Sequence, residues 1–134
     1  HRDLYARYSA EYPKHIGEAV KAGHGIAAVD YIAAQASRRA FRAEMGAIAA
    51  RYDALVSPTA AGPAPKGLES TGDPYYCAPW SFAGMPSISL PTGLAPDGLP
   101  FAVQLSGAPW CEARLLAAAA WCERVIGFKE MPRA

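Results

Sequence analysis

Hydrophobic positions between residues 28 and 52 repeat about every 3.6 residues, which predicts a helix with one apolar face. That face consists of Val29, Ile32, Ala33, Ala36, Ala40, Phe41, Ile48 and Tyr52. Residues 3–22 and 111–126 are predicted to form two further helices, the last closing near Gly127. Pro13 is expected to interrupt or kink the first helix, because proline lacks a backbone donor and clashes with the preceding turn.

Three short apolar runs predict buried strands, at residues 54–57, 87–90 and 101–106. The stretch between the first two, residues 58–80, is rich in glycine and proline and predicts a long loop, which in a compact domain is usually functional or disordered. Pro91 is expected to end the second strand, and Pro96, Asp97 and Gly98 to form a turn before the third. Alternating helices and strands favour an α/β fold with both sheet faces covered.

Charge points to no nucleic-acid partner. Thirteen basic and twelve acidic residues give a formal net charge of +1, without the basic excess of a nucleic-acid-binding protein. Arg38, Arg39 and Arg42 lie opposite the apolar face of their helix, and a solvated polar face is favoured there over an anion site.

Cysteine and histidine spacing indicates neither a disulfide framework nor a metal site. Three widely spaced cysteines include no CxxC pair, and His1, His15 and His24 lie too far apart for a helical pair of ligands. No apolar run reaches the roughly 18 to 20 residues that a membrane span needs. We therefore expect a cytoplasmic protein without a bound metal or cofactor, and His1 as first residue suggests the inside of a longer chain.

Local catalytic motifs are absent: the sequence has no GxSxG elbow, no phosphate-binding loop and no GxGxxG after a strand. Lys66 has no serine at a fixed partner spacing, so we interpret it as a surface lysine. In "ESTGDPYY", Thr71, Gly72 and Asp73 bring together a hydroxyl, a permissive backbone and a carboxylate. Either Thr71 or Asp73 caps a helix that has Pro74 at its first position, or the same loop lines a substrate pocket; the two interpretations are compatible.

Several longer motifs resemble one family in order and spacing. "YDALVSPTAAGPAP", "GDPYYCAPWSFAGMPSISLPTG", "DGLPFAVQLSG" and "EARLLAAAAWCE" are similar to the C-terminal part of the amidase signature family. The resemblance implies that residues 1–134 form the C-terminal segment of an α/β/α fold with a mixed central sheet, and hence an incomplete domain.

The resemblance also implies an activity for the complete domain, the hydrolysis of carboxylic amides to a carboxylate and ammonia or an amine. The family's nucleophilic serine is activated by a second serine in a cis peptide bond and by a lysine, all in its N-terminal part. This sequence contains neither the Gly/Ser-rich loop nor the lysine motif, so no catalytic residue is expected in it and the segment alone is expected to be inactive.

Thr71, Gly72 and Asp73 are the substrate-binding candidates that the resemblance implies. The expected partners are a small-molecule amide and the remainder of the amidase domain, without nucleic acid or membrane, and homo-oligomers are compatible. Where many relatives have asparagine, Ser81 stands in "SFAGMP", which weakens the similarity to the A subunit of glutamine-dependent tRNA amidotransferases. This amidotransferase component and a truncated, non-catalytic module remain the alternative functions.

Overall fold

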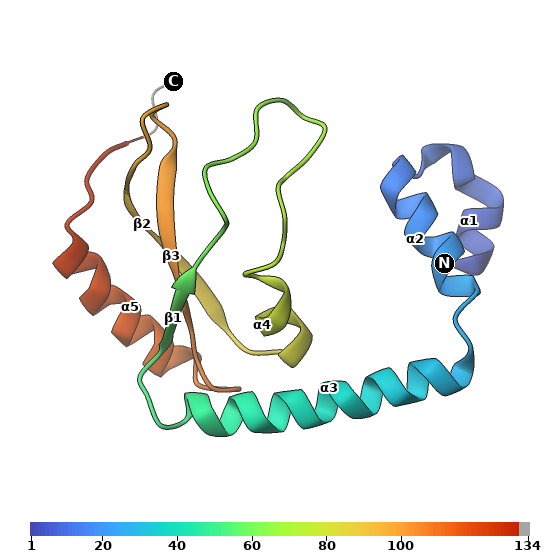
Figure 1. The fold of residues 1–134 in the computed structure, drawn as a ribbon, viewed down its shortest axis with the longest axis horizontal. Helices are drawn as coiled ribbons and strands as arrows, with labels where there is room; N and C mark the ends of the chain where they lie inside the picture. The colour runs from blue at the N-terminus through green and yellow to red at the C-terminus, as the bar shows by residue number, and fades with distance from the viewer. Residues whose placement is uncertain (132–134) are drawn as a thin grey trace. The chain divides into compact units, whose positions relative to one another are not determined.

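The computed structural model describes residues 1–131 as helices and three strands (Figure 1). The last three positions of the predicted segment 1–134 lie outside the described residues. The elements in chain order are α1 (Arg2–Tyr8), η1 (Ser9–Glu11), α2 (Lys14–His24), α3 (Ala28–Ala49), β1 (Leu55–Pro58), α4 (Ala78–Ala83), β2 (Ser87–Leu94), β3 (Pro100–Ser106) and α5 (Glu112–Ile126). They form two compact units, His1–Ser37 and the part that begins at Arg38.

The first unit is a helical hairpin in place of the single helix predicted over residues 3–22. Pro13 separates α2 from the 3-10 turn η1, as its missing donor leads one to expect. Tyr5 and Tyr12 pack edge to face with ring centroids 5.2 Å apart. Gly17 is buried, and a Cβ there would lie 3.1 Å from the Tyr5 hydroxyl. Glycine therefore allows α2 to approach the Tyr5 ring closely.

The second unit contains an antiparallel sheet with the strand order β1-β3-β2. Ser106 of β3 lies opposite Leu55 of β1 and Ser87 of β2. The prediction that Pro91 ends the second strand is wrong, since β2 continues to Leu94 through a register shift between Pro91 and Gly93. Because β2 is an edge strand of this sheet, a proline that cannot donate is tolerated in it.

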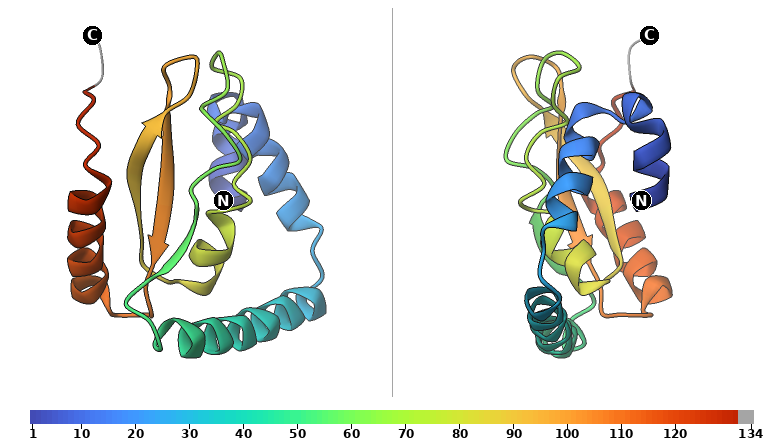
Figure 2. Two further views of the ribbon diagram at one scale, coloured as in Figure 1. Left: turned by 60° about the vertical axis from the view of Figure 1, so that its left-hand side comes forward. Right: turned by 90° about the vertical axis from the view of Figure 1, so that its right-hand side faces the viewer.

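One face of the sheet is apolar and packs on α5. Leu90 and Leu105 contact Leu115 and Ala119 of the helix in a single buried cluster. Figure 2 shows α5 on one side of the strands, with α4 and the loop before it on the other side. Period-two alternation therefore assigns the apolar residues of β2 and β3 to the α5 face.

A second apolar cluster lies at the junction of α3 and α4. Ala49, Ala83 and Met85 are buried there, and Phe41 and Trp80 pack against them. Only the C-terminal half of the predicted apolar face of α3 is used in this way, since Val29 and Ile32 are more than half exposed. The described chain is thus an α/β arrangement with a small antiparallel sheet, and it lacks the mixed sheet expected of the complete domain.

Two of the three arginines assigned to a solvated face pack against α4 instead. Arg38 donates from Nε to the carbonyl oxygen of Phe82 at 2.6 Å, at the C-terminus of α4. Gly84 follows with φ +64°, and a Cβ there would lie 2.6 Å from Nη1 of Arg42. Arg38 and Arg42 are half-buried and only Arg39 is exposed, so the prediction holds for Arg39 alone. Guanidinium groups favour this position because helix carbonyls at a C-terminus lack intrahelical donors.

The element boundaries differ from the predicted ones by a few residues. The helix predicted to 52 ends at Ala49, and the predicted loop 58–80 includes the first residues of α4. The turn before β3 has the predicted form, with Gly98 at φ +82° donating its N–H to the carbonyl oxygen of Ala95 at 2.9 Å. Within residues 1–131, no helix is both long and apolar enough to cross a membrane.

Candidate functional site

The candidate site is the connecting loop, defined as residues 59–77, which joins β1 to α4. It lies over the face of the sheet that does not contact α5 (Figure 2). The polar residues of that face are Ser57, Ser87, Ser89, Gln104 and Ser106, which the strand register places in adjacent rows. A face of hydroxyl and carboxamide groups can hold a loop by hydrogen bonds, since loop backbones carry unpaired donors and acceptors.

The first residue of the loop, Thr59, is tied to the sheet in two ways. Its N–H donates to the carbonyl oxygen of Ala102 at 3.3 Å, and its hydroxyl lies 3.0 Å from that of Ser89. The thiol of Cys77, at the other end of the loop, donates to the carbonyl oxygen of Thr59 at 3.3 Å. The two ends of the loop, Thr59 and Cys77, are 18 positions apart in the sequence and are joined directly by this hydrogen bond.

Gln104 forms the other attachment. Its Nε2 donates to the carbonyl oxygen of Tyr76 at 3.1 Å and lies 3.4 Å from the hydroxyl of Ser57. The residue is almost fully buried, with 5% of its surface exposed. Sequence reasoning missed this residue because a single glutamine in an apolar strand gives no local signal for a partner 28 positions away.

The C-terminal half of the loop carries the three predicted site residues, all of them exposed. The hydroxyl of Ser70 accepts from the N–H of Gly72 at 3.1 Å, and Gly72 has φ +94°, a conformation that favours glycine. Oδ1 of Asp73 accepts from the N–H of Tyr75 at 2.9 Å. The structure thus brings Gly72 and Asp73 into two successive side-chain turns, each closed within three residues.

The prediction that Thr71 or Asp73 caps a helix starting at Pro74 is wrong, because no helix starts there. Helix α4 begins four residues later, at Ala78, and its N-cap Cys77 makes no side-chain cap bond. Asp73 instead orders the turn before the helix, in which Cys77 and Ala78 both donate to the carbonyl oxygen of Pro74. The proline in the first turn of α4 is Pro79, whereas Pro74 lies inside the loop and starts no helix.

The exposed side chains of Asp73 and Tyr75 make a carboxylate and a phenol accessible to a ligand. One carboxylate oxygen of Asp73 is engaged by the Tyr75 amide, which fixes the orientation of the other. The Tyr75 residue is 71% exposed, and its ring packs edge to face on that of Tyr76, with ring centroids 5.2 Å apart. These groups can accept and donate hydrogen bonds, whereas a nucleophile needs an adjacent base, and residues 1–131 place none against them.

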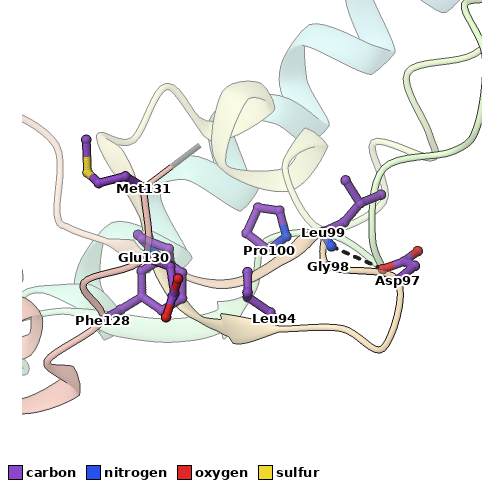
Figure 3. A pocket seen from close by; sticks show the side chains of 9 residues that line it. Leu94, Asp97, Gly98, Leu99, Pro100, Phe128, Glu130 and Met131 are labelled. Carbon is purple, nitrogen blue, oxygen red and sulfur yellow. Dashed lines mark hydrogen bonds between the residues drawn. The ribbon is translucent and has the colours of Figure 1, made fainter. Parts of the chain in front are cut away.

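A separate hollow of about 690 Å³ lies at the tip of the β2–β3 hairpin (Figure 3). Its lining is mainly apolar and consists of Pro91, Leu94, Asp97, Gly98, Leu99, Pro100, Phe128, Glu130 and Met131. Asp97 is used in the turn itself, where Oδ1 accepts from the N–H of Leu99 at 3.2 Å. Neither Thr71, Gly72 nor Asp73 borders this hollow.

The described residues contain no cluster of three histidine, cysteine or acidic side chains that could hold a metal ion. The cysteines in this part of the chain, Cys77, Cys111 and Cys122, are unpaired thiols. Ser87 and Ser106 share a hydrogen bond of 2.8 Å, and Ser106 is fully buried. This hydrogen bond joins β2 to β3, and the burial of Ser106 closes its hydroxyl to a substrate, whereas Ser87 is exposed.

Comparison with protein families identifies the chain. The Amidase family matches residues 7–116, most of the chain and all of the connecting loop. The chain therefore belongs to the Amidase family, which confirms the resemblance to the amidase signature proteins.

The similar curated proteins include hydrolases and amidotransferase components. A fatty acid amide hydrolase from Medicago truncatula is 34% identical over 112 residues, which covers 75% of this chain and 18% of that protein. The A subunit of the glutamyl-tRNA(Gln) amidotransferase from Neisseria meningitidis is 37% identical over 102 residues, covering 72% and 21%. The chain thus spans about a fifth of the length of these relatives.

Similar solved structures also match this chain to part of an amidase. An amidase crystal structure superposes with a TM-score of 0.80 and 28% identity over 93% of this chain and 31% of the amidase chain. A second, described as a vestigial protein complex that reveals the evolutionary origins of an s-triazine catabolic enzyme, gives a TM-score of 0.66 and 25% identity. The helices and small sheet described above thus match about a third of an amidase chain.

Proposed function

We propose that this chain is the C-terminal part of an amidase that hydrolyses a carboxylic amide to a carboxylate and ammonia or an amine. The observation that carries this proposal is the superposition of 93% of the chain on 31% of an amidase structure. In the complete domain, the sheet of β1, β2 and β3 adds to a larger mixed sheet covered by helices.

The catalytic residues of this proposal, a serine, a cis-serine and a lysine, belong to the rest of the domain. A serine hydroxyl is a weak nucleophile until a base removes its proton, and the oxyanion that forms needs fixed donors. This segment contributes the connecting loop, whose residues Thr71, Gly72 and Asp73 border the substrate cavity. Support comes from the exposure of these three residues and from the hydrogen bonds that fix the ends of the loop.

The proposal requires a small amide and the rest of the amidase domain as partners, and no cofactor, nucleic acid or membrane. A cytoplasmic location and a homo-oligomer are compatible with it.

A second candidate is the A subunit of a glutamine-dependent tRNA amidotransferase, which would pass ammonia to a partner protein. Its support is the identity of 37% to the corresponding protein from Neisseria meningitidis and of 40% to the one from Cereibacter sphaeroides. Genes for B and C subunits beside the gene for this chain would favour that role, whereas an isolated gene favours the free amidase. Ser81, which replaces the asparagine of many relatives, is exposed on α4.

The test is ammonia release by the complete protein that contains this sequence. Propionamide, benzamide and an amidated peptide sample aliphatic, aryl and peptide substrates. We expect hydrolysis of at least one by the complete protein and none by residues 1–134 alone. Activity of residues 1–134 that is lost on replacing one serine of this chain would contradict the assignment of catalysis to the remainder of the domain.

A further inference from the structure

We propose that Gln104 is the positioning residue of the connecting loop: its buried carboxamide fixes the loop end that carries Asp73. The part of this proposal that concerns substrate rests on the proposed function. The part that concerns the loop stands on the contacts of Gln104 alone.

The orientation of the carboxamide follows from its partners. A backbone carbonyl can only accept, so the group 3.1 Å from the Tyr76 oxygen is the NH₂ of Gln104. The same nitrogen lies 3.4 Å from the Ser57 hydroxyl of the neighbouring strand. Gln104 therefore links the loop to β1 and β3 at once.

Gln104 occupies a position where an apolar residue would fail. Its strand neighbours Val103 and Leu105 face α5, whereas Gln104 faces the loop. An apolar side chain here would leave the half-buried carbonyl of Tyr76 without its donor, which is unfavourable. The carboxamide is long enough to reach over the strand and supplies the required donor.

The attachment of Tyr76 to Gln104 also affects the position of Asp73. It follows Tyr75, whose N–H holds the carboxylate of Asp73 at 2.9 Å, and its ring packs against that of Tyr75. Releasing the Tyr76 carbonyl removes the hydrogen bond that joins residues 73–76 to the sheet, while Thr59 stays bound to Ser89 at the other end of the loop. Loss of Gln104 thus affects the Asp73 side of the loop first.

The test uses limited trypsin digestion of the complete protein, because Lys66 lies exposed within the loop. Gln104→Glu keeps the size of the side chain but turns its donor into a carboxylate that repels the Tyr76 carbonyl. We expect cleavage after Lys66 to be about 2- to 10-fold faster, the effect of losing one net hydrogen bond. Cleavage after Lys129, in the exposed tail, serves as the internal reference for trypsin activity.

Two further variants keep the result interpretable. Ser87→Ala removes a hydrogen bond from the same sheet face that does not involve the loop. The cleavage ratio, that of the rate after Lys66 to the rate after Lys129, should therefore stay unchanged in this variant. Thr59→Val removes the contact with Ser89 at the other loop end, and faster cleavage after Lys66 is expected again. If Gln104→Glu does not fold, Thr59→Val decides whether these sheet contacts restrain the loop.

Kinetics on the amide that the complete protein hydrolyses separate positioning from general stability. We expect KM to rise about 3- to 10-fold in Gln104→Glu with kcat within about 2-fold of the parent, because binding and not chemistry is disturbed. An unchanged cleavage ratio, or a fall in kcat at constant KM, would overturn the proposal. Absence of hydrolysis by the parent overturns the proposed function, and the digestion result then decides the role of Gln104 in the loop.

Discussion

Asp73 was predicted to cap a helix or to contact a substrate, and in the structure it closes a turn before α4. Oδ1 accepts from the Tyr75 amide, and the exposed carboxylate leaves Oδ2 directed to solvent or to a ligand. A carboxylate can therefore serve the loop with one oxygen and a substrate with the other. Replacements that keep or remove each property separate these roles.

We predict that Asp73→Ala raises KM for the amide substrate by more than it lowers stability. Asp73→Asn keeps the acceptor for Tyr75 but lacks the charge, so it should restore the turn and leave KM raised if the substrate group is cationic. Steady-state kinetics and urea denaturation of the complete protein provide the measurements. A stability loss of about 0.5 to 2 kcal/mol with unchanged kinetics would assign Asp73 to the turn alone.

Individual residues were predictable only where their signal is local. Gly72 and Asp73 stand out because turn chemistry uses residues within two or three positions. Gln104 and Thr59 were not found, since their partners Tyr76 and Ser89 lie 28 and 30 positions away. Arg38 was assigned to solvent for the same reason, because Phe82 is 44 positions distant.

Elements were predicted more completely than contacts. Helical periodicity located α3 and α5, and apolar runs located all three strands, because both patterns repeat within each element. The errors concern proline and strand position: Pro91 lies inside β2, which sequence alone cannot identify as an edge strand of this sheet. The start of helix α4 was predicted at Pro74 instead of Ala78, and the predicted loop took in its first residues, because six residues give too short a repeat.

The C-terminus of α4 gives a prediction at this scale. Gly84 combines φ +64° with a position 2.6 Å from Nη1 of Arg42, measured from the Cβ that alanine would add. Gly84→Ala should lower the free energy of unfolding by about 1 to 2 kcal/mol for the left-handed conformation, and further by displacing Arg42.

Gly98→Ala is the matched control, since Gly98 has φ +82° but no atom of the described chain within 4 Å of an added Cβ. The difference between the two variants in urea denaturation then reports the crowding at Arg42. Adding Arg42→Ala to Gly84→Ala should relieve that part. Equal losses in Gly84→Ala and Gly98→Ala would contradict a role for Arg42.

The whole molecule leaves much apolar surface uncovered for its size. Leu116, Trp121 and Val125 of α5 are each more than half exposed, and they lie at several positions around the helix outside the buried stripe of Leu115 and Ala119. A helix that is apolar all round is typical of a buried helix. Since the chain spans about a fifth of its curated relatives, the remainder of an amidase domain is the proposed cover for these side chains.

We therefore predict that residues 1–134 associate when produced alone. Size-exclusion chromatography with light scattering should give species larger than a monomer, because open strand edges and apolar faces favour self-association. Trp121→Glu with Val125→Lys should reduce the association, whereas Arg39→Ala, on an exposed part of α3, should not. A monomeric peak with a sharp cooperative melt would show that the segment is stable by itself.

The burial of Gln104 also has a chemical consequence over the lifetime of the protein. Its side chain is a carboxylic amide, the class of bond that the proposed enzyme hydrolyses in its substrates. Slow deamidation by water would convert Gln104 to glutamate, and the Tyr76 carbonyl would then face a negative charge in place of a donor. Because only 5% of the residue is exposed, water has little access to this amide, and we expect its deamidation to be slow.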